Sequence, residues 1–147
     1  MMETVLIVNT AATCVMTGVI WFVQRVHYPL LAIVGTERAI IVAQQHQRRT
    51  GQVVALPMAA EGVTTLLLLL NQPNGVSTIL PWIGAVLLAL ALGCTVTLSV
   101  PLHGRMATTP SIDTGARLVR TNWPRTVAWT LRAGVCVAML LQMSESF

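Results

Sequence analysis

The chain has 147 residues, of which 54% are hydrophobic and only 10% are charged. Soluble domains usually carry about a quarter charged residues, so this composition excludes an ordinary water-soluble domain and favours a protein that lies in a lipid bilayer. All of its basic residues are arginines, and the formal net charge is +4. The arginines lie at the ends of apolar segments or inside them, so the positive charge does not indicate a nucleic-acid partner.

Four apolar segments are each long enough to cross a membrane as a helix of about 20 residues. The first covers residues 4–26 and can extend past Pro29 towards residue 34, and a polar, helical stretch over residues 36–51 follows it. The second covers residues 52–70 and ends at a turn signal in residues 71–75. The third covers residues 78–100, and a loop then leads to the fourth, residues 118–143. We therefore predict one all-α domain, residues 1–147, folded as an integral membrane four-helix bundle.

The arginines outside the spans indicate how the chain is oriented. They fall only in the connections between spans 1 and 2 and between spans 3 and 4, while the other connection and both ends of the chain hold none. The positive-inside rule places such arginine-bearing loops in the cytoplasm. Both termini are therefore expected outside, on the periplasmic face of a cell membrane. The arginines in question are Arg38, Arg48, Arg49, Arg105, Arg117 and Arg120.

Polar residues in the fourth span recur on one face. Asn122, Arg125, Trp129, Arg132 and Cys136 follow one another at steps of three and four, which is the spacing of a helical stripe. An arginine near the centre of a membrane costs about 2.5–3.5 kcal/mol on insertion scales. Both arginines are therefore expected to face the interior of the bundle and to have partners there.

Glu61 in the second span is the natural partner. It lies eight to ten residues from the cytoplasmic end of that span, which is roughly 12–15 Å at the rise of an α-helix. Arg125 is expected to lie slightly shallower and Arg132 slightly deeper. We predict an ion pair between Glu61 and one of these two arginines.

The other two spans add polar residues at a similar depth. Gln24 and His27 lie three positions apart on one face of span 1, with Tyr28 beside them, and His103 ends a stripe of polar residues in span 3. Convergence of polar groups from four helices at one depth is typical of a binding site. The residues expected around one cavity in the cytoplasmic half are Gln24, His27, Glu61, His103, Asn122 and Arg125.

Each of these residues also has a purely structural explanation. Gln24 and Asn122 can hydrogen-bond between helices, for about 0.6 kcal/mol per contact. The two histidines of the site can place their rings at the membrane interface, and the ion pair can simply hold two helices together. His46, together with Arg48 and Arg49, is expected on a face that contacts water or lipid headgroups.

Four segments, one from each span, together resemble a widespread family of small, uncharacterised bacterial four-span membrane proteins. That family is distantly similar to the anthrone-oxygenase-like membrane proteins of polyketide pathways. The resemblance implies that the polar residues of these segments form the family's shared site, and it implies a multi-pass protein of the bacterial inner membrane. The segments are WFVQRVHYPL at residues 21–30, PMAAEG at 57–62, VPLH at 100–103 and NWPRTVAWTLR at 122–132.

These observations favour a small oxidoreductase-like enzyme that acts on a lipophilic phenolic or quinone-like molecule. The candidate catalytic residues, which would supply acid, base or electrostatic groups, are His27, Glu61, His103 and Arg125. The candidate substrate-binding residues are Gln24, Tyr28, Asn122, Trp129 and Arg132.

Two imidazoles and a carboxylate would suit a divalent transition metal, so the metal candidates are His27, Glu61 and His103. However, the sequence contains neither HExxH nor paired ExxH, so a metal cofactor stays an open question.

The alternative is an accessory subunit that catalyses nothing and packs against another membrane protein or a second copy of itself. Such a subunit could bind a pigment or a lipid. A transporter is less favoured, because the chain has no internal repeat. The enzyme and the packing subunit differ in one structural respect: an enzyme needs a cavity that reaches the polar residues from the lipid or the cytoplasm, whereas a packing subunit can fill that region with side chains.

Overall fold

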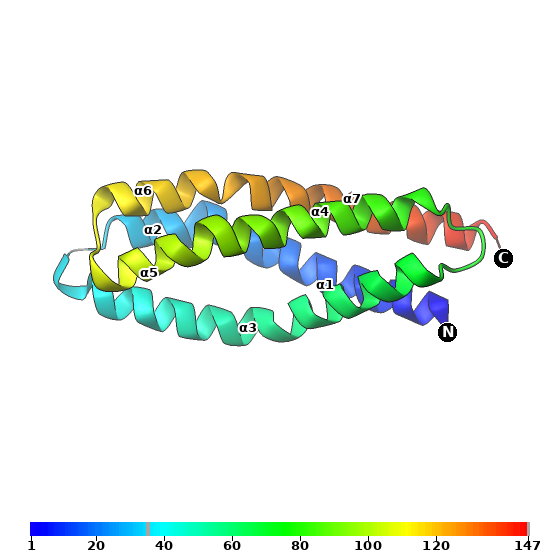
Figure 1. The fold of residues 1–147 in the computed structure, drawn as a ribbon, viewed down its shortest axis with the longest axis horizontal. Helices are drawn as coiled ribbons and strands as arrows, with labels where there is room; N and C mark the ends of the chain where they lie inside the picture. Colours follow the sequence, from blue (N-terminus) through cyan, green and yellow to red (C-terminus); the bar gives the residue numbers. More distant parts are fainter. Residues whose placement is uncertain (35, 147) are drawn as a thin grey trace.

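The computed structural model describes residues 1–34 and 36–146, the side chains of residues 36 and 37 excepted. Within these ranges the chain forms helices and no strands. Four long helical rods lie side by side, with both termini at one end of the bundle (Figure 1). Each rod is long and apolar enough to cross a membrane, over Met2–Ala32, Arg38–Leu70, Ile79–Thr108 and Ile112–Ser144. The predicted all-α architecture with four candidate spans is confirmed.

Three of the four rods consist of more than one helical element. The first rod contains α1 (Met2–Phe22), the π-helical turn η1 (Val23–His27) and α2 (Tyr28–Ala32), and the second is α3 (Thr36–Leu70) alone. The third contains α4 (Ile79–Cys94), the π-helical turn η2 (Thr95–Ser99) and α5 (Val100–Thr108). The fourth contains α6 (Ile112–Thr121) and α7 (Trp123–Ser144). We call the end where α2 is followed by α3 and α5 by α6 the basic end, and the opposite end, with both termini, the terminal end.

The rods extend further at the basic end than the predicted spans. The polar stretch and the second span form one continuous helix, α3, and the expected loop before the fourth span is helical except at residues 109–111. The Ser111 side chain caps α6 by accepting a hydrogen bond from the backbone N–H of Thr114 at 3.1 Å. A hydropathy pattern ends where polar residues begin, whereas a helix continues until a residue breaks it, so the helices are longer than the predicted spans.

A proline accompanies each of the two π-helical turns. Proline cannot donate to the carbonyl four residues before it, and its ring collides with that carbonyl. For Pro29 this is the carbonyl of Arg25, and for Pro101 it is that of Thr97, and each lies at the centre of a π-helical turn. A π-helical turn inserts an extra residue and rotates the next part of the helix. The two prolines therefore set the direction in which Tyr28 and His103, just beyond the turns, project.

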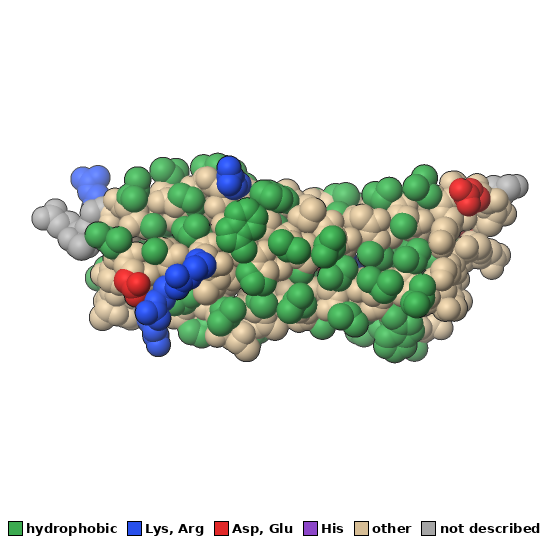
Figure 2. Space-filling view, turned by 90° about the horizontal axis from the view of Figure 1, so that it is seen from above, with side chains coloured by type: hydrophobic (Ala, Val, Ile, Leu, Met, Phe, Trp, Pro, Cys, Tyr) green, Lys and Arg blue, Asp and Glu red, His purple; other side chains and the backbone are tan. Residues whose placement is uncertain are grey.

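The rods pack chiefly through α1, which contacts α3 and α7, and through α4, which contacts α7. At the basic end α6 approaches α2 so closely that a Cβ atom on Gly115 would lie 2.7 Å from the Ala32 Cα, so this position requires glycine. Large apolar side chains such as Leu56, Leu70 and Leu131 are exposed. Figure 2 shows apolar side chains along the length of one face, with arginines gathered near the basic end, as expected for a bundle surrounded by lipid.

Candidate functional site

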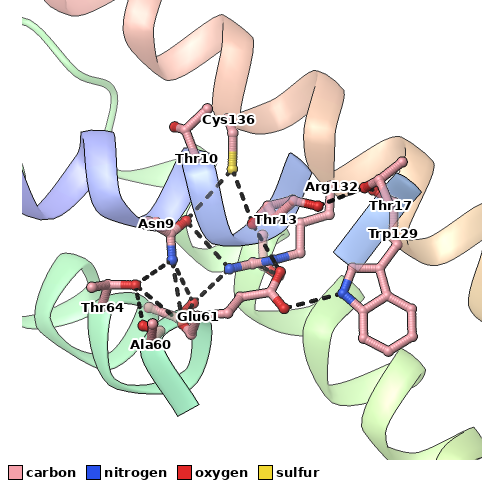
Figure 3. Close-up of polar contacts among 12 residues, drawn as sticks. Asn9, Thr10, Thr13, Thr17, Ala60, Glu61, Thr64, Trp129, Arg132 and Cys136 are labelled. Atoms are coloured by element: carbon pink, nitrogen blue, oxygen red, sulfur yellow. Dashed lines mark hydrogen bonds and ion pairs between the residues drawn. The ribbon is translucent and has the colours of Figure 1, made fainter. Parts of the chain in front are cut away.

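The buried polar side chains fall into two groups. The first, which we call the core cluster, lies among α1, α3 and α7 and includes Asn9, Thr13, Glu61, Thr65, Trp129, Arg132 and Cys136 (Figure 3). The second, which we call the cavity cluster, lies nearer the basic end and includes Gln24, Tyr28, His46, Ser99, His103, Asn122 and Arg125.

The core cluster is built around an ion pair between Glu61 and Arg132. The two side chains are 0% and 1% exposed, and Arg132 Nε lies 2.7 Å from Glu61 Oε1. The same oxygen accepts a hydrogen bond from Thr13 Oγ1 at 2.8 Å, and Oε2 accepts one from Trp129 Nε1 at 3.1 Å. The predicted pairing of Glu61 with Arg125 or Arg132 is confirmed, and Arg132 is the partner.

The rest of the Arg132 guanidinium is also paired. Its Nη1 donates to the backbone carbonyl of Gly84, and its Nη2 donates to Thr65 Oγ1 at 2.6 Å and to Asn9 Oδ1 at 3.3 Å. The Asn9 amide in turn donates to Thr64 Oγ1 at 2.8 Å. Neither Glu61 nor Arg132 lines either of the two cavities beside the histidines. Among the described residues, the polar groups of this network therefore satisfy one another and stand apart from the two cavities beside the histidines.

A cavity of about 270 Å³ lies between the first rod, α3 and the segment formed by η2 and α5. Exposed residues on α3 and α5, among them Gly51 and Val100, belong to its lining, so the cavity reaches the outer surface of the bundle. Its walls are polar near the basic end and apolar towards the middle of the bundle. The polar lining includes Tyr28, His46, Thr50, Ser99, His103 and Arg125, and the apolar lining includes Met16, Val19, Ile20, Val23, Val54 and Met58.

Three imidazoles and a phenol lie close together at the polar end of the cavity. The Tyr28 hydroxyl lies 2.7 Å from His103 Nε2. The His46 ring stacks on that of His27, with centroids 4.1 Å apart, and lies 5.0 Å from that of His103. His46 Nδ1 contacts Thr50 Oγ1 at 3.0 Å. The four aromatic rings therefore form one contiguous group contributed by the first, second and third rods.

The expectation that His46 faces water or headgroups is wrong, because its side chain is 8% exposed. It lies on the inward stripe of α3 with Ala39 and Ala43, at steps of four and three, while Arg48 and Arg49 are exposed. This spacing was visible in the sequence. It lies outside the predicted second span, which begins at residue 52.

Arg125 is held by neutral groups alone. Its Nη1 donates to Ser99 Oγ at 2.9 Å and to Asn122 Oδ1 at 2.9 Å, and its guanidinium carbon lies 5.5 Å from the centre of the Trp129 ring. The Asn122 amide donates to Gln24 Oε1 at 2.9 Å. Gln24 and Asn122 are both buried and lie outside the cavity lining, so they support the position of Arg125.

Three buried nitrogen atoms have no hydrogen-bond partner among the described residues: His27 Nε2, His103 Nδ1 and Arg125 Nε. Buried polar atoms are normally paired, and an unpaired one costs about 1–3 kcal/mol. His103 and Arg125 line the cavity, whereas His27 lines a second, neighbouring one of about 360 Å³ between α1 and α3. Two of the three unpaired atoms therefore belong to side chains that a ligand in the first cavity can reach.

The predicted metal ligands do not come together. Glu61 belongs to the core cluster, and His27 and His103 both lie ring against ring with His46. Across the described ranges, no group of three or more His, Cys, Asp or Glu side chains is placed to hold a metal ion. The three candidate ligands therefore do not form one metal-binding group, because Glu61 lies in the core cluster away from the two histidines.

The predicted site residues thus divide three ways. Tyr28, His103 and Arg125 line the cavity, with Gln24 and Asn122 behind Arg125. His27 contacts the cavity cluster from the neighbouring cavity, and Glu61, Trp129 and Arg132 form the core cluster. His46 is not among the predicted site residues, yet it lines the cavity. Comparisons of this chain with known protein families, with curated proteins and with solved structures give no match.

Proposed function

We propose that this protein binds a lipophilic phenolic or quinone-like molecule in the cavity and acts on it as a small oxidoreductase-like enzyme of the membrane. One observation carries the proposal: the cavity reaches the outer surface of the bundle and joins an apolar wall to a group of acid–base side chains. Its volume of about 270 Å³ lies close to the lower end of the range for small-molecule pockets, roughly 300–1,000 Å³. That size suits one small ring system.

The side chains at the polar end could carry the proton-transfer part of such a reaction. The Tyr28 hydroxyl and the His103 imidazole form a hydrogen-bonded pair that can accept a proton from a phenol and return it. Arg125 is positioned to stabilise negative charge that develops on the oxygen of the substrate. In this proposal His103 is the base, Tyr28 relays the proton, and His46 holds the two rings in place by packing.

The alternative is a non-catalytic accessory subunit, and one that only packs, without binding a pigment or a lipid, has no need of a cavity beside the polar residues. The cavity therefore favours the enzyme over the packing subunit. The exposed apolar surface does not discriminate between them, because lipid covers such a surface on any four-span protein.

We further propose that the basic end faces the cytoplasm of a bacterial cell and that both termini face the periplasm. The arginines at the basic end support this orientation. Asn74 and Thr109 are both exposed and lie at opposite ends of the bundle. With the native cysteines replaced, a cysteine at position 74 is expected to react with a membrane-impermeant label in intact spheroplasts, and one at position 109 only after lysis. The reverse pattern would contradict the orientation.

The proposed ligand can be sought directly. Protein purified in mild detergent is expected to yield a lipophilic aromatic molecule on extraction and mass spectrometry, and the Gly51→Phe variant is expected to lose it. Gly51 is exposed and lines the cavity, and a Cβ atom added there meets nothing within 4 Å, so the variant should fold. Gly62→Phe is the matched control, since Gly62 lies on the same helix with equal space but outside the cavity lining.

If the wild-type protein yields no such molecule and binds no alkylated phenol or quinone saturably, the accessory-subunit alternative becomes the better one. Equal retention by the Gly51→Phe and Gly62→Phe variants would place the ligand elsewhere.

A further inference from the structure

Among the described residues, Arg125 is a buried cation without an acidic partner. It is 9% exposed, and its two hydrogen bonds go to the neutral side chains of Ser99 and Asn122. Arg132, on the same helix, is even more deeply buried, at 1% exposed, but it is paired with the carboxylate of Glu61. An arginine is always charged in proteins, so its burial without an anion is unfavourable. Arg125 therefore lacks the counter-charge that the structure provides for Arg132.

The remaining acids lie elsewhere. The chain has five acidic residues, of which Glu61 pairs with Arg132 and Asp113 pairs with the exposed Arg117 at 2.9 Å. Glu3 and Glu145 are exposed at the terminal end. Glu37 precedes His46 by nine positions in α3, which is about 13 Å along the helix axis. No acid belongs to the described lining of the cavity.

The other ionisable groups that face the cavity do not supply the missing charge. They are the imidazoles of His46 and His103, which can only gain a positive charge, and the phenol of Tyr28, which is neutral in its ordinary form. Arg125 Nε and His103 Nδ1 are both without a hydrogen-bond partner among the described residues. The polar end thus combines an excess of positive charge with free nitrogen atoms, and an oxyanion would satisfy both through charge-assisted hydrogen bonds.

From this geometry we infer that the ligand carries a negatively charged oxygen on an apolar body, as a phenolate or a lipophilic carboxylate does, and that Arg125 is its counter-ion. The inference rests on the proposed function, because it concerns the same cavity, and it specifies the ionisation state in which the ligand is held. The anionic oxygen lies at the Arg125 and His103 end, and the apolar body lies along Ile20, Val54 and Met58.

The test uses 4-nitrophenol carrying an octyl chain, whose ionised form is coloured, with the full-length protein in phosphatidylcholine nanodiscs. Protein-bound probe is expected to ionise at a pH at least about one unit lower than probe in empty nanodiscs, which corresponds to a tenfold preference for the anion. The methyl ether of the same probe cannot ionise, and it is expected to bind at least about tenfold more weakly.

Variants assign the effect to one residue. Arg125→Gln is expected to abolish the ionisation shift while binding of the ether persists, and Arg125→Lys, which retains the charge, should keep part of the shift. Arg120→Gln removes the same charge from an exposed position outside this cavity, and Glu37→Gln removes the acid whose side chain the structure does not describe. Both should behave as wild type. Thermal unfolding of each variant verifies that it folds.

The outcomes separate the two proposals. If phenol and ether bind equally and ionisation does not shift, or if folded Arg125→Gln retains the shift, the charge inference is overturned and the proposed binding function survives. A change with Glu37→Gln would also overturn it, by identifying that acid as the counter-ion. If neither probe binds saturably, both proposals fail. Where the inference holds, competition between dodecanoate and dodecylphenol at one pH decides whether the preferred anion is a carboxylate or a phenolate.

Discussion

Arg125 and Arg132 lie on the same face of α7, seven positions and about 10 Å apart, and they differ in almost every contact. Arg132 has a carboxylate, a carbonyl and two neutral side chains as partners, and it lies in a region without space. Arg125 has two neutral partners and an unpaired nitrogen, and it lines a cavity. Trp129 contacts both clusters, because its ring lies near the Arg125 guanidinium and its indole N–H donates a hydrogen bond to Glu61.

The difference shows how two identical side chains can serve different purposes in one helix. A buried charge whose hydrogen bonds are all made contributes to the stability of the folded structure. Removing its partner leaves an unpaired buried charge, which destabilises that structure. A buried charge that keeps a free donor beside open space can interact with a ligand. The core cluster is therefore expected to determine stability, and the cavity cluster to determine binding.

The largest effect on stability is expected from breaking the ion pair of the core cluster. Arg132→Leu and Glu61→Leu should each destabilise the protein by about 3–5 kcal/mol, because each leaves an uncompensated buried charge among neutral side chains. The double variant should lose less than the sum of the two. The free energy of unfolding in a fixed detergent mixture measures all three, and additive losses would show that the two side chains do not act as a pair.

A smaller loss should follow from crowding the same cluster. A Cβ atom on Gly84 would lie 3.0 Å from Arg132 Nη1, whereas one on Gly93 meets nothing within 4 Å. Gly84→Leu should therefore cost about 1–3 kcal/mol through overpacking. Gly93→Leu, on the same helix, is the control and should change the unfolding midpoint little. If both substitutions lowered the unfolding midpoint equally, the core cluster would be shown to accommodate the added side chain without strain.

Arg125→Leu is the direct counterpart of Arg132→Leu. It removes two hydrogen bonds, each of which contributes about 1 kcal/mol, but it also removes a buried charge that has no acidic partner. The two terms oppose each other, so the net change in unfolding free energy should stay within about 1 kcal/mol. A loss as large as that of Arg132→Leu, measured in the same detergent, would contradict the contrast between the two arginines.

Tyr28→Phe should have the smallest effect on stability. It deletes the hydroxyl that lies 2.7 Å from His103 Nε2 and leaves the ring packing intact. Polar contacts between membrane helices average about 0.6 kcal/mol, and a loss of that order is expected in the unfolding free energy. Turnover or release of the bound aromatic molecule should change far more than stability does. If stability falls by several kcal/mol while ligand handling is unchanged, the pair is structural.

Much of the architecture could be predicted from the residues alone. The length of the apolar segments determined that there are four candidate spans, because a helix of about 20 apolar residues is what a bilayer accommodates. The pairing of Glu61 with an arginine of the fourth span followed from the cost of isolated charge in lipid and from counting residues to a common depth. Both inferences depend on quantities that can be counted along the sequence: the length of an apolar segment and the number of residues from its end to a given side chain.

The division of the polar residues into two clusters could be decided only by the tertiary structure. Depth along a helix does not tell in which direction a side chain points, and the π-helical turns before Pro29 and Pro101 rotate the helical segments beyond them. Glu61 and His103 were expected together because of similar depth, yet one faces a packed interior and the other a cavity. His46 was expected to face water or headgroups because hydropathy ends a span at its first polar residues, whereas burial at the basic end depends on how α3 packs against α2 and α5.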